Sequence, residues 1–147
     1  ISTPLIFHLL NNAGIIRDMH FMLQKEVVER LAAGPGGGDW GRLSIMVQYH
    51  CRVEHLFNVG PGAFNPPPKV DSGVIRLRLR KDHKLACDEV FFKRVVKTAF
   101  NQRRKTMRNS LKSLLPADYS SIPYLDLRPE QLHFSAFVTL TNALKAG

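Results

Sequence analysis

Hydrophobic residues recur at helix and strand spacings through the first half of the chain. Apolar side chains in residues 5–10 repeat at helical intervals behind Thr3 and Pro4, which suit a helix cap and first turn, so we expect a short buried helix. Residues 19–23 are apolar with little alternation, which predicts a central strand covered on both faces. A helix over residues 25–33 follows, in which Glu26 and Arg30 form an outward pair of opposite charges four residues apart.

The pattern continues into a further helix and two strands. Helical spacing marks residues 43–50, and alternation marks strands at residues 52–59 and 74–80. The glycine-rich segment 34–39 follows a helix and lacks Gly-Lys-Ser/Thr, so it predicts a flexible loop and not a phosphate site. Helices and strands in this order indicate the second half of an α/β sheet.

Only helical patterns follow the polar segment 81–87. Asp88 is placed to cap a helix with apolar residues through Phe100, a basic helix then extends to Pro116, and Ser135 is placed to cap a last helix. We therefore expect two parts joined by a linker: residues 1–80 as α/β, 81–87 as the linker and 88–147 as a small all-α domain.

The densest cationic run lies on the predicted basic helix, with the sequence FNQRRKTMRNSL from Phe100 to Leu111. At 3.6 residues per turn its apolar residues share one side: Phe100, Met107, Leu111 and Leu114. Its cations occupy the adjoining arc: Arg104, Lys105, Arg108 and Lys112. Because arginine can direct two donors to one phosphate, the run predicts an RNA-binding helix, with a solvated basic face as the alternative. No acidic residue occurs between Glu89 and Asp118, which favours RNA.

Composition narrows the classes of partner and site. The formal net charge of +9 favours a polyanion, and no apolar stretch approaches the roughly 20 residues of a membrane helix, so we expect nucleic acid and no membrane. The two cysteines, Cys51 and Cys87, allow free thiols in a reducing compartment or a single bridge, and we favour free thiols. The six histidines lack metal-ligand spacing, so no metal site is expected.

A second informative segment, GPGAFNPPPKVDS, joins the two predicted strands at 52–59 and 74–80. Three successive prolines fix φ and bias Asn65 toward an extended conformation, so the loop is stiff and holds Phe64 in one pose. A rigid aromatic suits the stacking of a base flipped out of its helix. An isolated phenylalanine is also typical of a core position.

Both segments resemble motifs of one enzyme family. FNPPPKVDS is similar to the Phe-x-Pro-x-Pro-x-Val-x-Ser motif of RNA adenine dimethyltransferases. FNQRRKTMRNSL resembles the helical-domain signature of the KsgA-type branch, which dimethylates adenines near the 3′ end of small-subunit (16S) ribosomal RNA. The resemblance also covers residues 1–5, 19–27 and 49–51, and it weakens after residue 115.

The resemblance implies a Rossmann-like methyltransferase that uses S-adenosylmethionine. In that family the Ile-Ser-Thr-Pro segment follows an Asn-Leu-Pro-Tyr tetrapeptide, and the cofactor residues come earlier. This chain starts at Ile1, without an initiator methionine. We therefore expect a truncated, C-terminal part of the enzyme that contains no cofactor-binding residues, binds no cofactor and is inactive by itself.

The resemblance also implies roles for individual residues. Phe64 corresponds to one side of the pair that stacks the target base. The implied RNA contacts are Arg103, Arg104 and Lys105, with Lys69, Arg30, Arg108 and Arg128 as weaker candidates. Since the first three lie off the apolar side of the predicted helix, we expect their replacement to leave folding nearly unchanged.

The implied chemistry needs no metal and no covalent enzyme intermediate, because the protein only positions an amine against a methyl donor. The expected partners are small-subunit ribosomal RNA and the small ribosomal subunit, for a cytoplasmic monomer active in ribosome biogenesis. The alternatives are a non-catalytic RNA-binding or ribosome-assembly module, a large-subunit RNA resistance methyltransferase, or a mitochondrial relative that acts in transcription. The segment from Phe100 to Leu111 argues against the last two.

Overall fold

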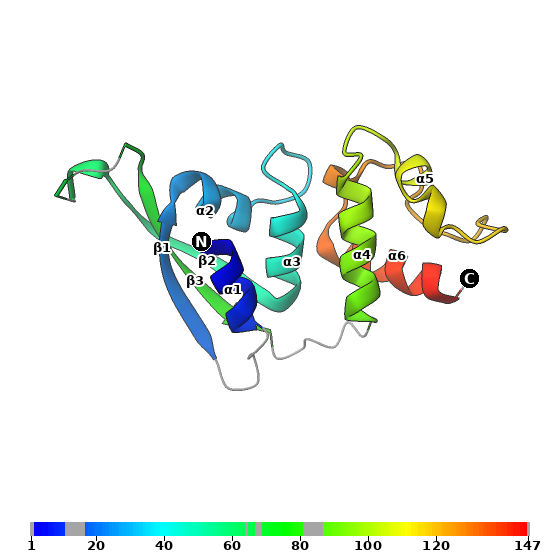
Figure 1. Ribbon diagram of the computed structural model, residues 1–147, viewed down its shortest axis with the longest axis horizontal. Coiled ribbons are helices and arrows are strands. Elements are labelled where there is room, and N and C mark those ends of the chain that lie inside the picture. The colour runs from blue at the N-terminus through cyan, green and yellow to red at the C-terminus, as the bar shows by residue number, and fades with distance from the viewer. Residues whose placement is uncertain (1, 11–16, 64, 67–68, 81–86, 147) are drawn as a thin grey trace.

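The computed structural model describes residues 2–10, 17–63, 65–66, 69–80 and 87–146, which form a sheet with its helices and a helical layer beside them (Figure 1). The first part contains α1 (Ser2–Leu10), β1 (Asp18–Gln24), α2 (Lys25–Ala32), α3 (Arg42–His50), β2 (Cys51–Val59), the 3₁₀ turn η1 (Pro61–Ala63) and β3 (Ser72–Leu79). The second contains α4 (Glu89–Phe100), α5 (Met107–Ser110), η2 (Lys112–Leu114), η3 (Pro129–Gln131) and α6 (Phe134–Ala146). The predicted α/β class and order of elements are confirmed.

The strands form an antiparallel sheet in the order β1-β3-β2. The register sets Met19 opposite Leu77 and Phe21 opposite Ile75, so these side chains share one face. Three helices cover that face with buried residues: Ile6 and Leu10 from α1, Val28 and Leu31 from α2, and Val47 from α3. The sheet therefore packs in a single layer against α1, α2 and α3.

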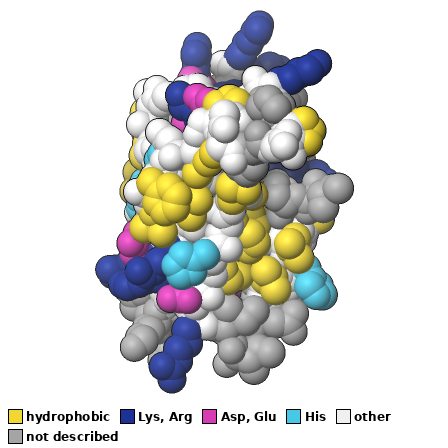
Figure 2. Space-filling model, turned by 90° about the vertical axis from the view of Figure 1, so that its left-hand side faces the viewer, with side chains coloured by type: hydrophobic (Ala, Val, Ile, Leu, Met, Phe, Trp, Pro, Cys, Tyr) yellow, Lys and Arg dark blue, Asp and Glu magenta, His cyan; other side chains and the backbone are white. Residues whose placement is uncertain are grey.

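Among the described residues β1 is an edge strand with one covered face, whereas cover on both faces is predicted for the complete sheet. Its side chains alternate, with Met22 53% exposed and Leu23 7% exposed. On the outer face Met22 lies opposite Val74, which also pairs with Phe57. Figure 2 shows hydrophobic side chains gathered on this side of the molecule. An apolar run cannot report whether its second face is covered, because that depends on distant segments.

α3 has apolar side chains on two sides and packs into two cores. Val47 is buried with the sheet, whereas Ile45, Met46 and Tyr49 are buried with α4 and α6. The rings of Tyr49 and Phe92 lie 4.5 Å apart between centroids. One helix therefore joins the sheet to the helical layer.

The continuous basic helix predicted after Phe100 is wrong. α4 ends at Phe100, residues 101–105 form turns, and helical structure returns only at Met107. Thr106 is extended, with φ −65° and ψ 158°, so it interrupts the helical path. The cations of this run therefore lie on a turn and a four-residue helix.

Long-range hydrogen bonds explain this break. The N–H of Met107 donates to the carbonyl of Leu127 at 2.7 Å, and that of Arg108 donates to Leu125 at 2.8 Å. These bonds satisfy donors that a helix start otherwise leaves free. Met107 and Leu111 are still fully buried, as the apolar pattern predicts, although a different backbone path brings them there.

The predicted helix starts are partly correct. The Asp88 carboxylate accepts the N–H of Phe91 at 3.1 Å, which confirms the predicted cap of α4. α1 begins at Ser2, so Thr3 lies in the first turn and is not the cap. Residues 81–86 of the predicted linker lie outside the described residues.

His133, and not Ser135, caps α6. The helix begins at Phe134, and the imidazole Nδ1 of His133 accepts the N–H of Ser135 at 3.2 Å. The ring stacks on buried Trp40 with centroids 6.1 Å apart. Burial, with a smaller effect of Arg80, lowers the pKa of His133 from its usual 6.5. The neutral ring is therefore favoured, as its acceptor role requires.

We expect this cap to make folding depend on pH. Because the pKa of His133 is lower in the folded state, the unfolded chain binds the proton more readily, and the free energy of unfolding must fall as pH drops below about 6.5. The variant His133→Asn keeps a cap acceptor that does not titrate. Urea unfolding at pH 7.5 and 5.5 should show a smaller loss of stability for this variant than for the wild type. Equal losses would contradict a role for His133.

Candidate functional site

The loop between β2 and β3 lies at the sheet edge where β1 also ends. Gln24 and Val59 are the last residues of β1 and β2, and both pair with Ser72. The carboxyl ends of two strands thus meet the proline-rich segment, and ligands of open α/β sheets bind at this kind of edge. Phe64 and residues 67–68 lie outside the described residues, so base stacking by Phe64 stays a prediction.

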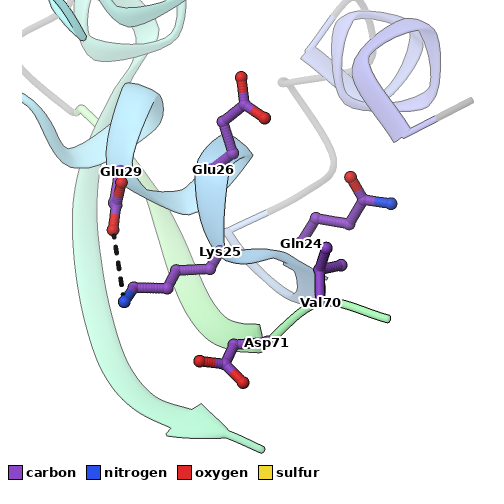
Figure 3. Close-up of a pocket in the computed structure, with 6 residues that line it drawn as sticks. All are labelled: Gln24, Lys25, Glu26, Glu29, Val70 and Asp71. Carbon is purple, nitrogen blue, oxygen red and sulfur yellow. Dashed lines mark ion pairs between the residues drawn. The ribbon is translucent and has the colours of Figure 1, made fainter. Parts of the chain in front are cut away.

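A surface pocket of about 360 Å³ opens at this edge (Figure 3). It is lined by Gln24, Lys25, Glu26, Glu29, Val70 and Asp71. The backbone N–H of Lys25 donates to the carbonyl of Asp71 at 2.9 Å, which ties the start of α2 to the end of the loop. The Lys25 ammonium lies 3.9 Å from the Glu29 carboxylate. Sequence reasoning missed Gln24 and Asp71, which strand pairing brings together.

Arg103, expected to contact RNA, binds other parts of the protein, and its side chain is 35% exposed. Its Nη2 donates to the carbonyls of Gly37, Gly38 and Trp40 at 3.3, 3.1 and 2.7 Å. Its Nε donates to the carboxylate of Glu130 at 3.2 Å. The guanidinium therefore joins the glycine-rich loop to the helical layer. From these contacts we expect its loss to destabilise the fold, which differs from the expectation drawn from the sequence. Its donors meet partners that are distant in sequence.

The other two cations of the run are exposed. Arg104 and Lys105 lie on the turn after α4, and neither forms an ion pair with another described residue. Arg108 is instead paired with Asp126 at 2.8 Å and lies over the ring of Tyr119 at 5.5 Å. Arg104 and Lys105 are therefore the members of the run best placed to meet a phosphate.

The weaker candidates are scattered over the molecule. Arg30 is paired with Glu26 at 2.6 Å on α2, as predicted. Lys69 and Arg128 are both exposed. The segment that enters β3 and contains Lys69 lies at the opposite end of the long axis from α5 (Figure 1). We call the turn with Arg104 and Lys105 the cationic turn. The sheet-edge site is the pocket lined by Gln24, Lys25, Glu26, Glu29, Val70 and Asp71. The structure separates these two sites and does not gather the candidate residues into one cluster.

The thiols are unsuited to nucleophilic catalysis. Cys51 and Cys87 are free, which confirms the favoured interpretation. Burial raises the pKa of Cys51 to about 12, and it also raises the pKa of Cys87, whose sulfur lies 3.6 Å from the Tyr49 hydroxyl. Both thiols therefore stay protonated at neutral pH. Within the described ranges no three His, Cys, Asp or Glu side chains converge as metal ligands, and no helix is long and apolar enough to cross a membrane.

Comparison with protein families and relatives gives a consistent match. A family model described as ribosomal RNA adenine dimethylase matches residues 1–127. Ribosomal RNA small subunit methyltransferase A of Pseudomonas fluorescens (strain Pf0-1) is 70% identical over 98% of this chain and 54% of its own length. The protein of the same name from Pseudomonas aeruginosa PAO1 is 68% identical over 98% of this chain and 55% of its own length. The chain thus spans about half the length of the curated relatives it matches.

Solved structures support the same fold. A dimethyladenosine transferase from Plasmodium falciparum aligns with a TM-score of 0.87 and 25% identity, over 99% of this chain and 63% of that one. The 23S rRNA methyltransferase ErmE aligns with a TM-score of 0.67 and 22% identity, over 97% of this chain and 61% of that one. These neighbours confirm the Rossmann-like methyltransferase class, and the relatives do not favour the large-subunit alternative.

The contacts of Arg103 predict that its replacement destabilises the fold more than replacement of the neighbouring cations Arg104 and Lys105. Arg103→Ala should lower the free energy of unfolding by about 1–3 kcal/mol, because it removes hydrogen bonds to three carbonyls and a carboxylate. Arg104→Ala and Lys105→Ala are the matched controls and should each change it by less than about 0.5 kcal/mol. Arg103→Lys should recover only part of the loss, since an ammonium lacks the planar fork. Equal effects at all three positions in urea unfolding would refute this assignment.

Proposed function

Since this chain belongs to the ribosomal RNA adenine dimethylase family, we propose that it is part of an enzyme that dimethylates adjacent adenines near the 3′ end of small-subunit (16S) ribosomal RNA. The observation that carries the proposal is the 70% identity, over 98% of the chain, to a relative named ribosomal RNA small subunit methyltransferase A. The enzyme would act in ribosome biogenesis as a cytoplasmic monomer, with the small ribosomal subunit as its partner.

We propose that different parts of the chain have different roles. Residues 1–80 contribute the target-base edge of the catalytic domain, residues 81–87 link it to the rest, and residues 88–147 dock on RNA. The separation of the sheet edge from the cationic turn supports this arrangement, because one end handles the base while the other meets the phosphate backbone. Docking by phosphate contacts orients the enzyme without reading the sequence.

We propose that the described residues do not hold S-adenosylmethionine, which supplies the methyl group in this family. The glycine-rich loop presents the carbonyls of Gly37 and Gly38 to Arg103 and not to a ligand. The pocket at the sheet edge has carboxylates and an ammonium around it, with Val70 as its one apolar lining residue. We propose that residues outside this chain hold the cofactor, and that this chain alone binds RNA without methylating it.

The role left to the sheet edge is to hold the adenine. We propose that Phe64 stacks on the extruded base from the loop after β2, as the family motif implies. Extruding a base from its helix costs a few kcal/mol, and stacking on an aromatic side chain compensates part of that cost. The protein thereby presents the exocyclic amine in one orientation, and orientation is the main demand of this methyl transfer.

The stacking role can be tested in an enzyme with the full length of its relatives that contains this chain. Phe64→Ala should lower methylation of small-subunit particles by roughly 5- to 150-fold, since stacking on an aromatic is worth about 1–3 kcal/mol per base. Particle binding should stay nearly intact. Phe57→Ala, at an exposed aromatic on β2, is the matched control and should keep full activity. Loss of folding or docking with chemistry preserved would instead show that Phe64 fills a core position.

The docking role can be tested by the salt dependence of binding. Replacing Arg104 and Lys105 together with Ala should weaken binding to small-subunit ribosomal RNA and make the slope of log affinity against log salt shallower by about 1.4–1.8, at 0.7 to 0.9 per phosphate contact. Folding should not change, because both side chains are exposed. Unchanged slope and affinity would remove this turn from the RNA-binding surface.

A further inference from the structure

The solvent side of α4 carries a cationic face that the helical pattern alone does not single out. The buried residues of this helix all point to one side: Phe92, Val95, Val96 and Ala99. At 3.6 residues per turn, Lys93, Arg94 and Lys97 fall on the opposite side, and all three are exposed. Val90 lies on the same side and is 83% exposed. We call Lys93, Arg94 and Lys97 the α4 cationic face.

The charges of this face are not neutralised within the described part of the chain. None of the three forms an ion pair with another described residue. Some cations on the sheet are paired, in contrast: Arg76 lies 3.8 Å from Asp18, and Arg78 lies 3.5 Å from Glu54. Near the start of α4, the Asp88 carboxylate is bound to Lys145 and to the cap. Three cations on one side of one helix therefore keep their charge without an ion pair in the described part of the chain.

The face leads directly into the cationic turn. α4 ends at Phe100, and Asn101 keeps a right-handed helical conformation with its N–H donating to the carbonyl of Lys97 at 3.0 Å. The chain therefore continues along the helix before it reaches Arg104 and Lys105. At about 1.5 Å per residue, the twelve residues of α4 extend about 18 Å. The α4 cationic face and the turn are therefore too long together to contact only one phosphate group.

We propose that the α4 cationic face is a second phosphate-binding surface for RNA, which extends the contact made by Arg104 and Lys105. The inference rests on the proposed function and names the part of the protein that meets the RNA backbone. Charge complementarity supports RNA as the occupant, because five exposed cations follow one another with no acidic residue between positions 90 and 117. An anionic membrane fits less well, because a membrane-bound helix also needs a broad apolar side. On the solvent side of α4, Val90 is the one large apolar residue that is exposed.

The inference predicts a specific change in the salt dependence of RNA binding. The purified protein carrying Lys93→Gln, Arg94→Gln and Lys97→Gln should bind a transcript of small-subunit ribosomal RNA more weakly, with a slope of log affinity against log salt shallower by about 2 to 3. The matched control carries Arg17→Gln, Arg42→Gln and Arg52→Gln, which removes the same charge from exposed sites off α4. Its slope should stay near that of the wild type.

A second variant separates binding from folding. Val90→Glu places an anion beside the α4 cationic face, in the first turn of the helix, where an acidic side chain favours helix formation. It should therefore fold at least as well as Val90→Gln and bind the same RNA more weakly than Val90→Gln. Equal RNA affinity of these two variants would overturn the inference, even if the triple variant failed to fold.

The outcomes also separate this inference from the proposed function. If replacing Arg104 and Lys105 changes the slope while the α4 triple variant does not, the α4 surface is overturned and the proposed function stands. If the triple and control variants change the slope equally, only net charge matters and the inference falls. If the wild type binds anionic vesicles and not RNA, both proposals fall.

Discussion

The packing of α3 between two cores is the constraint on which the rest of the structure depends. The loop before this helix is fixed to the helical layer twice: the buried indole of Trp40 donates to the carbonyl of Leu132 at 2.7 Å, and the Trp40 carbonyl accepts from Arg103 at 2.7 Å. With the start of α3 held there and Val47 buried against the sheet, the sheet cannot turn freely against α4. The sheet edge and the cationic surfaces therefore keep fixed positions relative to each other.

Features that depend on neighbouring residues could be predicted from the sequence. Alternation identifies β3, helical spacing identifies α2 and α4, and Asp88 identifies the start of α4, because each signal arises within one or two turns of chain. The break after Phe100 could not be predicted in this way. It depends on hydrogen bonds to the carbonyls of Leu125 and Leu127, and no periodic pattern near Phe100 contains them. The cap of α6 by His133 was missed because imidazole is not a usual cap side chain.

In the candidate site, too, local sequence signals were predictable and features that depend on distant contacts were not. Motifs locate Phe64 and the run of cations. Residue type alone cannot show which of three adjacent cations binds the protein itself and which faces solvent. Tertiary structure separates them: Arg103 is held by the loop before α3, whereas Arg104 and Lys105 face solvent. The α4 cationic face matches no motif, and the apolar side of that helix gives the stronger periodic signal. The available signal was the lack of acidic residues between positions 90 and 117.

In the sheet formed by the described residues, β1 has no neighbour on its outer edge, and this has a consequence for how this chain behaves in concentrated solution. An unpaired strand edge offers backbone donors and acceptors to strands of other molecules, and here exposed Met22 lies on the same strand. The net charge of +9 opposes such self-association by mutual repulsion, and added salt screens this repulsion. Salt thus acts on the protein in two ways at once: the ions that release it from a polyanion also favour its aggregation through the sheet.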